Sequence, residues 1–203
     1  VRVGVMCVGI QPRRQRRLLW ATPLLFAALW VAYIVSAMRA PDGRIATALD
    51  WGVLTGGLDS VVAWRTAMAD GSVLRLVSGL FLHADWIHLL GNLVFLLIFG
   101  LPAERTMGGR RFLLLFLLGG AVANLAAVLA IGAPDRVVIG ASGAVSALIG
   151  AYLALFPGAR LGVVLPLGLF LEFVRVPAFL LIGLWVLLQL GFAYSGPTFG
   201  AVA

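Results

Sequence analysis

The sequence predicts an all-α fold, a polytopic bundle of membrane-spanning helices. Hydrophobic residues make up 62% of the 203 residues and charged residues only 11%, whereas soluble domains average about 45–50% and about 25%. A disordered chain needs the opposite balance, with low hydrophobicity and high charge. The apolar residues also fall into long runs of about 20 residues, the length that a helix needs to cross a bilayer. Composition and patterning together argue against a soluble globular domain.

Five apolar stretches are predicted to cross the membrane as helices. They cover about residues 18–38, 86–103, 112–134, 140–157 and 176–195. The segment at 161–171 is too short to span and contains Pro166, so we expect it to lie at the membrane surface. Ser-Gly-Pro at 195–197 indicates a break, and a sixth span would start near residue 199. We therefore expect five spans to be present and the sixth to be missing, as in a truncated chain.

Charge predicts the orientation of the bundle. Residues 1–17 contain a cluster of four arginines, and the loop at 104–111 contains three arginines and one glutamate. The loop at 39–75 is neutral, with four arginines and four aspartates. Because arginine-rich loops stay on the cytoplasmic side, we expect residues 1–17 to be a cytoplasmic basic segment. Residues 18–203 would then form the membrane domain, with an outer loop at 39–75.

The basic residues have a membrane explanation rather than a nucleic-acid one. All 15 are arginine and the net charge is +7, but the main cluster directly precedes an apolar run. A nucleic-acid surface needs basic residues along one polar face, so no nucleic-acid partner is expected. The first apolar run exceeds the roughly 7–15 residues of a signal-peptide core, and we interpret it as a retained anchor in the lipid bilayer.

Few polar residues interrupt the predicted spans, and polar groups inside a membrane are functional candidates. His88 and Asn92 are four residues apart, on one face of the second span and near its outward end. Ser142 lies at the outward end of the fourth span, between Gly140 and Gly143. The predicted topology puts these three polar side chains in the same leaflet, where they can converge.

Such a convergence suits acyl-transfer chemistry. A serine at the amino end of a helix has its own backbone N–H free of an intrahelical acceptor. The amide of Asn92 and the imidazole of His88 offer two further N–H donors. Donors aimed at one point can stabilise an oxyanion, and the glycines beside Ser142 would let a substrate backbone come close.

Each of these residues also has a plainer interpretation. Gly-x-Ser-Gly occurs in packed membrane helices, and His88 with Asn92 can simply form interhelical hydrogen bonds. His83 and His88 can be read as metal ligands, but a spacing of five turns them to different faces and no third ligand is evident. Packing or loop roles are the simplest interpretation of the other polar residues: Glu104 with Arg105 as a loop ion pair, Asn124 as a structural residue, and Trp185 with Gln189 as packing residues.

Taken together, the motifs resemble those of the rhomboid family of intramembrane serine proteases. His83-x₄-His88-x₃-Asn92 is similar to that family's H-x₄-H-x₃-N, and Gly140-x-Ser142-Gly143 to its G-x-S-G. Arg75 resembles the arginine of the family's Trp-Arg element, with leucine in place of the tryptophan. The resemblance runs from about residue 73 onward and includes the order and spacing of the motifs.

The resemblance implies roles for these residues. Ser142 would be the nucleophile, with His88, Asn92 and the backbone of Ser142 as the oxyanion hole. The supporting residues would be His83, Gly140 and Gly143. No cofactor and no metal is implied.

The sequence departs from the family pattern at two places. Family members often have an aromatic residue four positions after the serine, where this chain has Ser146. The family's general base is a histidine in an Ala-His-x-Gly-like context at the start of the sixth span. This chain has two histidines, both in the second-span motif. We therefore expect a rhomboid chain that ends before its base and is inactive by itself.

The leading functional hypothesis is an intramembrane serine endopeptidase of the bacterial cytoplasmic membrane. Its substrates would be transmembrane helices of other proteins, cut near the outer face. The alternative is a non-catalytic rhomboid-like protein that binds transmembrane helices. A small transporter or channel is less well supported. Such a protein would be expected to have ionisable residues at mid-membrane and repeated halves, and the sequence shows neither.

Overall fold

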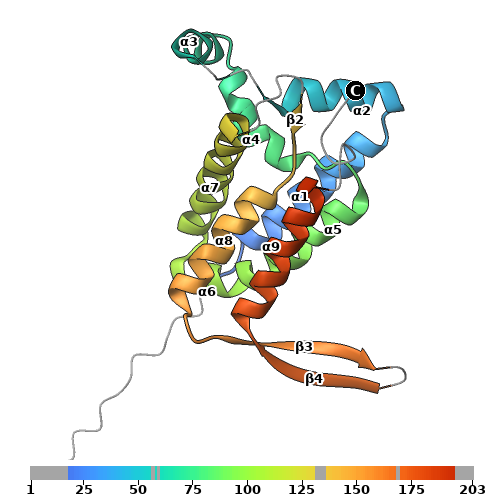
Figure 1. Ribbon diagram of the computed structural model, residues 1–203, viewed down its shortest axis with the longest axis vertical. Helices are drawn as coiled ribbons and strands as arrows, with labels where there is room; N and C mark the ends of the chain where they lie inside the picture. The colour runs from blue at the N-terminus through green and yellow to red at the C-terminus, as the bar shows by residue number, and fades with distance from the viewer. Residues whose placement is uncertain (1–17, 56–57, 59, 131–135, 168–169, 195–203) are drawn as a thin grey trace, which may run out of the picture.

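The computed structural model describes residues 18–194, except for 56, 57, 59, 131–135, 168 and 169. It is a bundle of helices with two small antiparallel sheets (Figure 1). The helices are α1 (Ala21–Ala37), α2 (Pro41–Trp51), α3 (Val61–Ala69), α4 (Arg75–Ser78), α5 (Trp86–Phe95), α6 (Leu101–Met107), α7 (Gly109–Ala130), α8 (Ser142–Leu155) and α9 (Ala178–Tyr194). The strands are β1 (Val53–Leu54), β2 (Val137–Val138), β3 (Arg160–Leu167) and β4 (Phe170–Pro177). The helical fold class is confirmed. The basic segment, the break after α9 and the sixth span lie outside the described residues.

Among the described residues two helices are long and apolar enough to cross a membrane. A π-helical turn joins α5 to α6, so that Trp86–Met107 forms one helix of 22 residues, and α7 also has 22. The apolar helices α1 and α9 have 17 residues each, and α8 has 14. At 1.5 Å per residue α8 is only about 21 Å long, against a hydrocarbon core of about 30 Å.

The helix α8 is short because its predicted first turn is not helical. Gly140 has a φ of +116°, which a right-handed helix cannot contain. The chain therefore stays non-helical from β2 to Ala141, and the helix begins at Ser142. The first two residues of the fourth predicted span, Gly140 and Ala141, accordingly form a turn.

The helix α7 has one buried face and an exposed apolar face. One face buries large and polar side chains, with Phe112, Phe116 and Asn124 among them. The side chains of Leu114, Leu118 and other large apolar residues on the outer faces of the bundle are more than half exposed. Such an apolar exterior is unfavourable in water and suits hydrocarbon.

The helices α7 and α8 pack unusually closely. A Cβ atom added to Gly143 would lie 2.5 Å from the Cβ of Ala123, and one added to Gly119 would lie 2.5 Å from the Cβ of Ala147. Side chains larger than hydrogen do not fit at these two glycines. Small residues let membrane helices approach one another, and here they fix the helix that carries Ser142.

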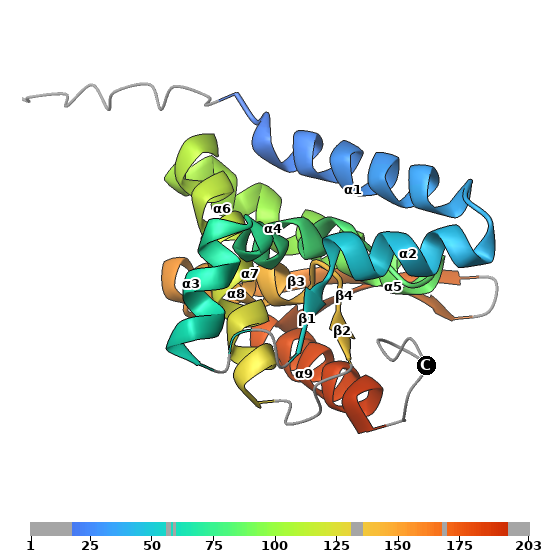
Figure 2. The same cartoon turned by 90° about the horizontal axis from the view of Figure 1, so that it is seen from above.

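The predicted outer loop is a folded segment that reaches the start of α8. It contains α2 and α3, and its strand β1 pairs with β2 in the register Val53 to Val138 (Figure 2). Arg75 donates from Nη1 to the carbonyl of Leu49 at 3.1 Å, which ties α4 to α2. The segment at 39–75 and the β3–β4 hairpin lie at opposite ends of the bundle (Figure 1).

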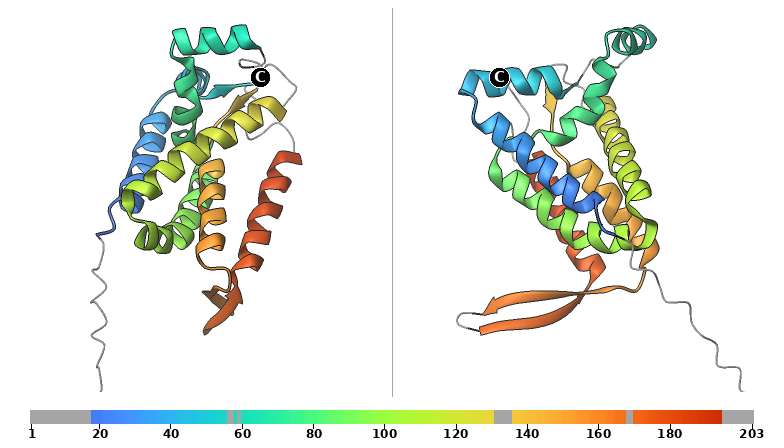
Figure 3. Two further views of the ribbon diagram at one scale, coloured as in Figure 1. Left: turned by 90° about the vertical axis from the view of Figure 1, so that its left-hand side faces the viewer. Right: turned by 180° about the vertical axis from the view of Figure 1, so that it is seen from behind.

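The segment at 161–171, which is expected at the membrane surface, belongs to a β-hairpin. The strands pair antiparallel from Arg160 opposite Pro177 to Leu167 opposite Phe170. The hairpin connects α8 to α9 and projects sideways from the bundle (Figure 3). Pairing satisfies the backbone groups of this apolar stretch, which a loop could not do without water.

The ion pair predicted for Glu104 and Arg105 is wrong. The carboxylate of Glu104 is buried and accepts three backbone N–H groups at the start of α1, from Trp20, Ala21 and Thr22, each at 2.8 Å. The first N–H groups of a helix have no intrahelical partner, and an anion at that end is favourable. In the described part of the chain Arg105 is exposed and no ion pair links it to Glu104.

We expect Glu104→Ala to destabilise the bundle by roughly 2–5 kcal/mol, because three buried N–H groups lose a charged acceptor. Glu104→Gln should have a smaller effect, since its side-chain carbonyl still accepts. Thermal unfolding in detergent measures both, with Asp50→Asn as the control because Asp50 is an exposed carboxylate. Equal unfolding midpoints for Glu104→Ala and Asp50→Asn would contradict the capping role.

Candidate active site

The two sequence motifs meet at the backbone that precedes α8. A Cβ atom on Gly140 would lie 2.7 Å from Cε1 and 2.8 Å from Nε2 of His88. The Nε2 atom of His83 accepts the N–H of Ala141 at 3.4 Å. The two imidazole rings are 5.1 Å apart between centroids, edge to face. Both histidines therefore lie against the two residues that lead into Ser142.

The conformation of Gly140 makes this approach possible. Its positive φ of +116° is a region that residues with a Cβ rarely adopt. Its N–H donates to the carbonyl of Gly79 at 2.9 Å, which anchors the turn to the segment before the second span. A side chain at position 140 would also collide with the imidazole of His88. Glycine is therefore required at this position on both grounds.

The start of α5 is held by an aspartate that sequence reasoning did not single out. Asp85 is the N-cap of α5, and its Oδ1 accepts the N–H groups of Ile87 and His88, both at 2.8 Å. The guanidinium of Arg44 donates to the carbonyl of Ala84 at 2.8 Å. An aspartate directly before an apolar run is a standard N-cap signal, so Asp85 was detectable. It fixes the backbone that carries His88.

Asn92 lies one turn below His88 and is buried. Its Nδ2 donates to the carbonyl of His88 at 3.0 Å. Its Oδ1 accepts no hydrogen bond in the part of the chain that the structure describes. Because an –NH₂ group carries two N–H bonds and one of them donates to His88, the amide keeps a second N–H that can donate.

Ser142 is the first residue of α8 and is half-buried. Its position in the first helical turn leaves its backbone N–H without an intrahelical acceptor. The partial positive charge at this end of the helix favours a negative charge there. The arrangement thus offers a hydroxyl, a backbone donor and a favourable field at one point.

Ser146, which stands where family members often have an aromatic residue, contacts an aromatic residue of another helix. The hydroxyl of Ser146 donates to the carbonyl of Ser142 at 2.8 Å and accepts the indole N–H of Trp185 at 3.1 Å. The Trp185 ring lies 4.4 Å from that of Phe95 between centroids. Trp185 of α9 therefore contacts both α5 and α8, a role that the helical spacing alone did not indicate.

Burial sets the protonation of the first histidine. Burial, with a smaller contribution from the neighbouring His88, lowers the pKa of His83 to about 3. The imidazole of His83 is therefore neutral at pH 7, which leaves Nε2 able to accept the Ala141 N–H. Among the described residues no three His, Cys, Asp or Glu side chains form a group that could hold a metal ion.

Other polar residues have structural roles. Asn124 of α7 donates from Nδ2 to the carbonyl of Leu76 at 2.9 Å, as expected for a structural residue. Ser78 donates to the carbonyl of Trp51 at 2.7 Å. These contacts hold the segment at 72–81 between the outer loop and α7. Gly79, which accepts the N–H of Gly140, belongs to this segment and was missed because no local pattern reports a distant backbone partner.

Comparison with known proteins identifies the family. The Rhomboid domain model matches residues 70–203. YdcA of Bacillus subtilis, named as a candidate rhomboid protease, is 36% identical over 96 residues, 47% of this chain and 47% of that protein. RHOMBOID-like protein 5 of Arabidopsis thaliana is 33% identical over 90 residues, 44% of this chain and 29% of its own. Rhomboid-like protease 3 of Toxoplasma gondii is 37% identical over 92 residues, 45% of this chain and 34% of its own.

The matched part spans about half or less of the length of each of these curated relatives. The family match itself covers well over half of this chain and includes both motifs. The chain therefore belongs to the rhomboid family of membrane-integral proteins, which are generally intramembrane serine proteases.

Proposed function

We propose that this protein is an intramembrane serine endopeptidase that cleaves transmembrane helices of other membrane proteins. The observation that carries the proposal is the contact of His83 and His88 with the Gly140–Ala141 backbone directly before Ser142. Two motifs separated by about fifty residues have no packing reason to bring these particular polar groups together. Acyl transfer needs a nucleophile and N–H donors for the oxyanion, and the proposal assigns these roles to Ser142 and to the residues around it.

In this proposal the Ser142 hydroxyl attacks a peptide carbonyl of the substrate. The carbonyl oxygen becomes an oxyanion, stabilised by the backbone N–H of Ser142, the amide of Asn92 and a ring N–H of His88. The amine product leaves with a proton, and water then hydrolyses the acyl-enzyme to release the acid and restore Ser142. A substrate helix has to unwind locally, because each helical carbonyl accepts the N–H of the residue four positions later.

The hydroxyl proton needs an acceptor, and the family resemblance assigns that role to a further histidine. The 203 residues contain two histidines, and the proposal uses both at the oxyanion hole or in its support. We therefore expect the 203-residue chain by itself to react only slowly, because a serine hydroxyl without a base is a poor nucleophile.

The alternative is a rhomboid-like protein that binds transmembrane helices without cutting them. The discriminating experiment uses the protein as its gene encodes it, purified and placed in liposomes with a fluorescent transmembrane substrate. Cleavage, with the cut position read by mass spectrometry close to one membrane face, supports the protease. Substrate binding without cleavage, and without labelling by a fluorophosphonate, supports the alternative.

The proposal includes an orientation, with the amino terminus in the cytoplasm of a bacterium and residues 39–75 outside. Val62 on α3 is 73% exposed, so Val62→Cys in a Cys7→Ser background should be labelled in intact cells by a membrane-impermeant maleimide. Arg105→Cys at the other end of the bundle should be labelled only after permeabilisation. The reverse pattern would overturn the orientation and, with it, cleavage near the outer face.

A further inference from the structure

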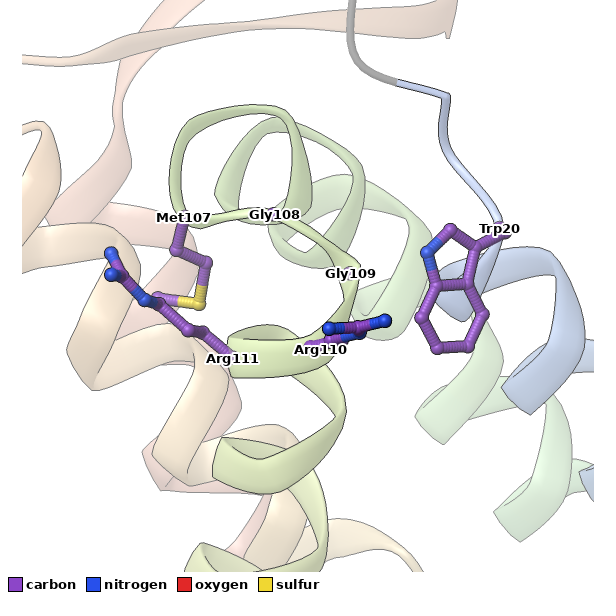
Figure 4. Close-up of a pocket in the computed structure, with 6 residues that line it drawn as sticks. All are labelled: Trp20, Met107, Gly108, Gly109, Arg110 and Arg111. Carbon is purple, nitrogen blue, oxygen red and sulfur yellow. The ribbon is translucent and has the colours of Figure 1, made fainter.

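A cavity of about 340 Å³ lies at the end of the bundle where α6 meets α7 (Figure 4). Its lining residues are Trp20, Met107, Gly108, Gly109, Arg110 and Arg111. In Figure 4 the side chain of Arg110 reaches toward the Trp20 indole, and that of Arg111 extends on the opposite side beside Met107. This cavity is far along the bundle from the segment at 39–75, so it is separate from the candidate active site.

The walls of the cavity are fixed by contacts already described. The backbone of Trp20 is held by Glu104, which accepts its N–H. The Trp20 ring lies so close to Gly109 that any Cβ there would collide with the indole. Gly108 has a φ of +86°, which forms the tight turn between the two helices. The cavity is therefore a built feature of the α1, α6 and α7 junction rather than a gap between mobile side chains.

The cavity is cationic and its charges are not neutralised. In the described part of the chain neither Arg110 nor Arg111 makes a hydrogen bond or an ion pair with a protein group. The carboxylate of Glu104 is turned toward the start of α1. Two guanidinium groups beside a tryptophan ring favour an anionic ligand with an apolar part, because arginine binds phosphate and tryptophan prefers the membrane interface.

An apolar track on α7 leads away from this cavity. Arg110, Leu114, Leu118 and Val122 are spaced by four residues, so they lie along one helix face. The three apolar side chains are 56%, 62% and 66% exposed. A charged site at the end of an exposed apolar stripe of helix matches a molecule with an anionic head and a hydrocarbon tail.

We propose that this cavity binds the phosphate headgroup of an anionic phospholipid, whose acyl chain lies along the Leu114, Leu118 and Val122 stripe. Free inorganic phosphate has no group for that stripe, and a zwitterionic lipid would bring a second cation toward the two arginines. Basic pockets between membrane helices are known to take anionic headgroups. The site would hold α1 against α6 and α7 and is independent of whether the protein cleaves substrates.

Native mass spectrometry of the protein in detergent tests this proposal, with phosphatidylglycerol and phosphatidylcholine as probes. We expect phosphatidylglycerol to be retained preferentially and to raise the unfolding midpoint. Arg110→Gln with Arg111→Gln should weaken its binding by roughly 10- to 30-fold, as expected for removing two interfacial arginines. The control is Arg65→Gln with Arg136→Gln, which removes the same charge from exposed side chains elsewhere.

Three results would overturn the proposal. The first is unchanged phosphatidylglycerol binding in the Arg110 and Arg111 double variant. The second is an equal loss in the Arg65 and Arg136 control, which would indicate attraction by net charge alone. The third is a stability gain of the same size from inorganic phosphate, which would identify an anion site without a lipid.

Discussion

In the protein as its gene encodes it, replacing Ser142 by alanine is expected to reduce cleavage of a transmembrane substrate to the background rate. Removing the nucleophile of a catalytic unit typically costs on the order of 10³-fold or more, because its members act together. The folded protein should survive, since no hydrogen bond of the Ser142 hydroxyl holds the described structure together. The carbonyl of Ser142, which accepts from Ser146, is unaffected by the change.

The matched control is Ser36→Ala on α1, a serine of a membrane helix whose hydroxyl makes no hydrogen bond in the described part of the chain. It should cleave at the parent rate. A fluorophosphonate should label the parent and Ser36→Ala but not Ser142→Ala, provided that unfolding midpoints agree. Full activity in Ser142→Ala would show that the nucleophile has been assigned to the wrong residue.

The helical fold follows from the sequence because its signal is local and repeated. In hydrocarbon every backbone N–H and C=O must be satisfied within the chain, so a long apolar run without breaks has few choices besides a helix. The prediction of a continuous helix is less reliable where the apolar run contains glycine or proline. Because of the glycine at 140, the fourth helix begins two residues later than predicted, and the run at 161–171 belongs to a β-hairpin.

What the sequence could not predict depends on partners far apart along the chain. Nothing near Glu104 indicates that its carboxylate accepts N–H groups some eighty residues earlier. The pairing of Val53 with Val138 brings the outer loop to the start of α8 in the same way. Both features satisfy backbone groups, which all residue types except proline carry alike, so the sequence does not mark them.

The residues of the candidate site were easier to single out from the sequence than these long-range contacts. Its polar residues are expensive inside a membrane, so they stand out from the composition, and the spacing of His88 and Asn92 places them on one face. The way in which the site is built was not visible. The contact of His88 with Gly140 and the contact of Trp185 with Ser146 each join different helices, and helical periodicity reports only one helix at a time.

Asn92→Ala is expected to lower kcat by about 10²–10³-fold, the usual effect of removing one oxyanion-hole donor. The KM should change little, because this donor would act on charge that develops only in the transition state. Asn92 is buried, and its one hydrogen bond within the described part of the chain goes to the carbonyl of His88 on its own helix. Its loss should therefore cost less folding stability than activity.

The comparison that isolates this effect is Asn124→Ala, a second buried asparagine in a membrane helix. Asn124 joins α7 to the Leu76 carbonyl across two segments of the chain, and losing that contact leaves a buried acceptor unsatisfied at a cost of about 1–3 kcal/mol. We expect Asn124→Ala to unfold earlier but to keep a near-parental kcat per folded molecule. If both variants lose activity only in proportion to their loss of folded protein, Asn92 has a structural role and its assignment to the oxyanion hole is wrong.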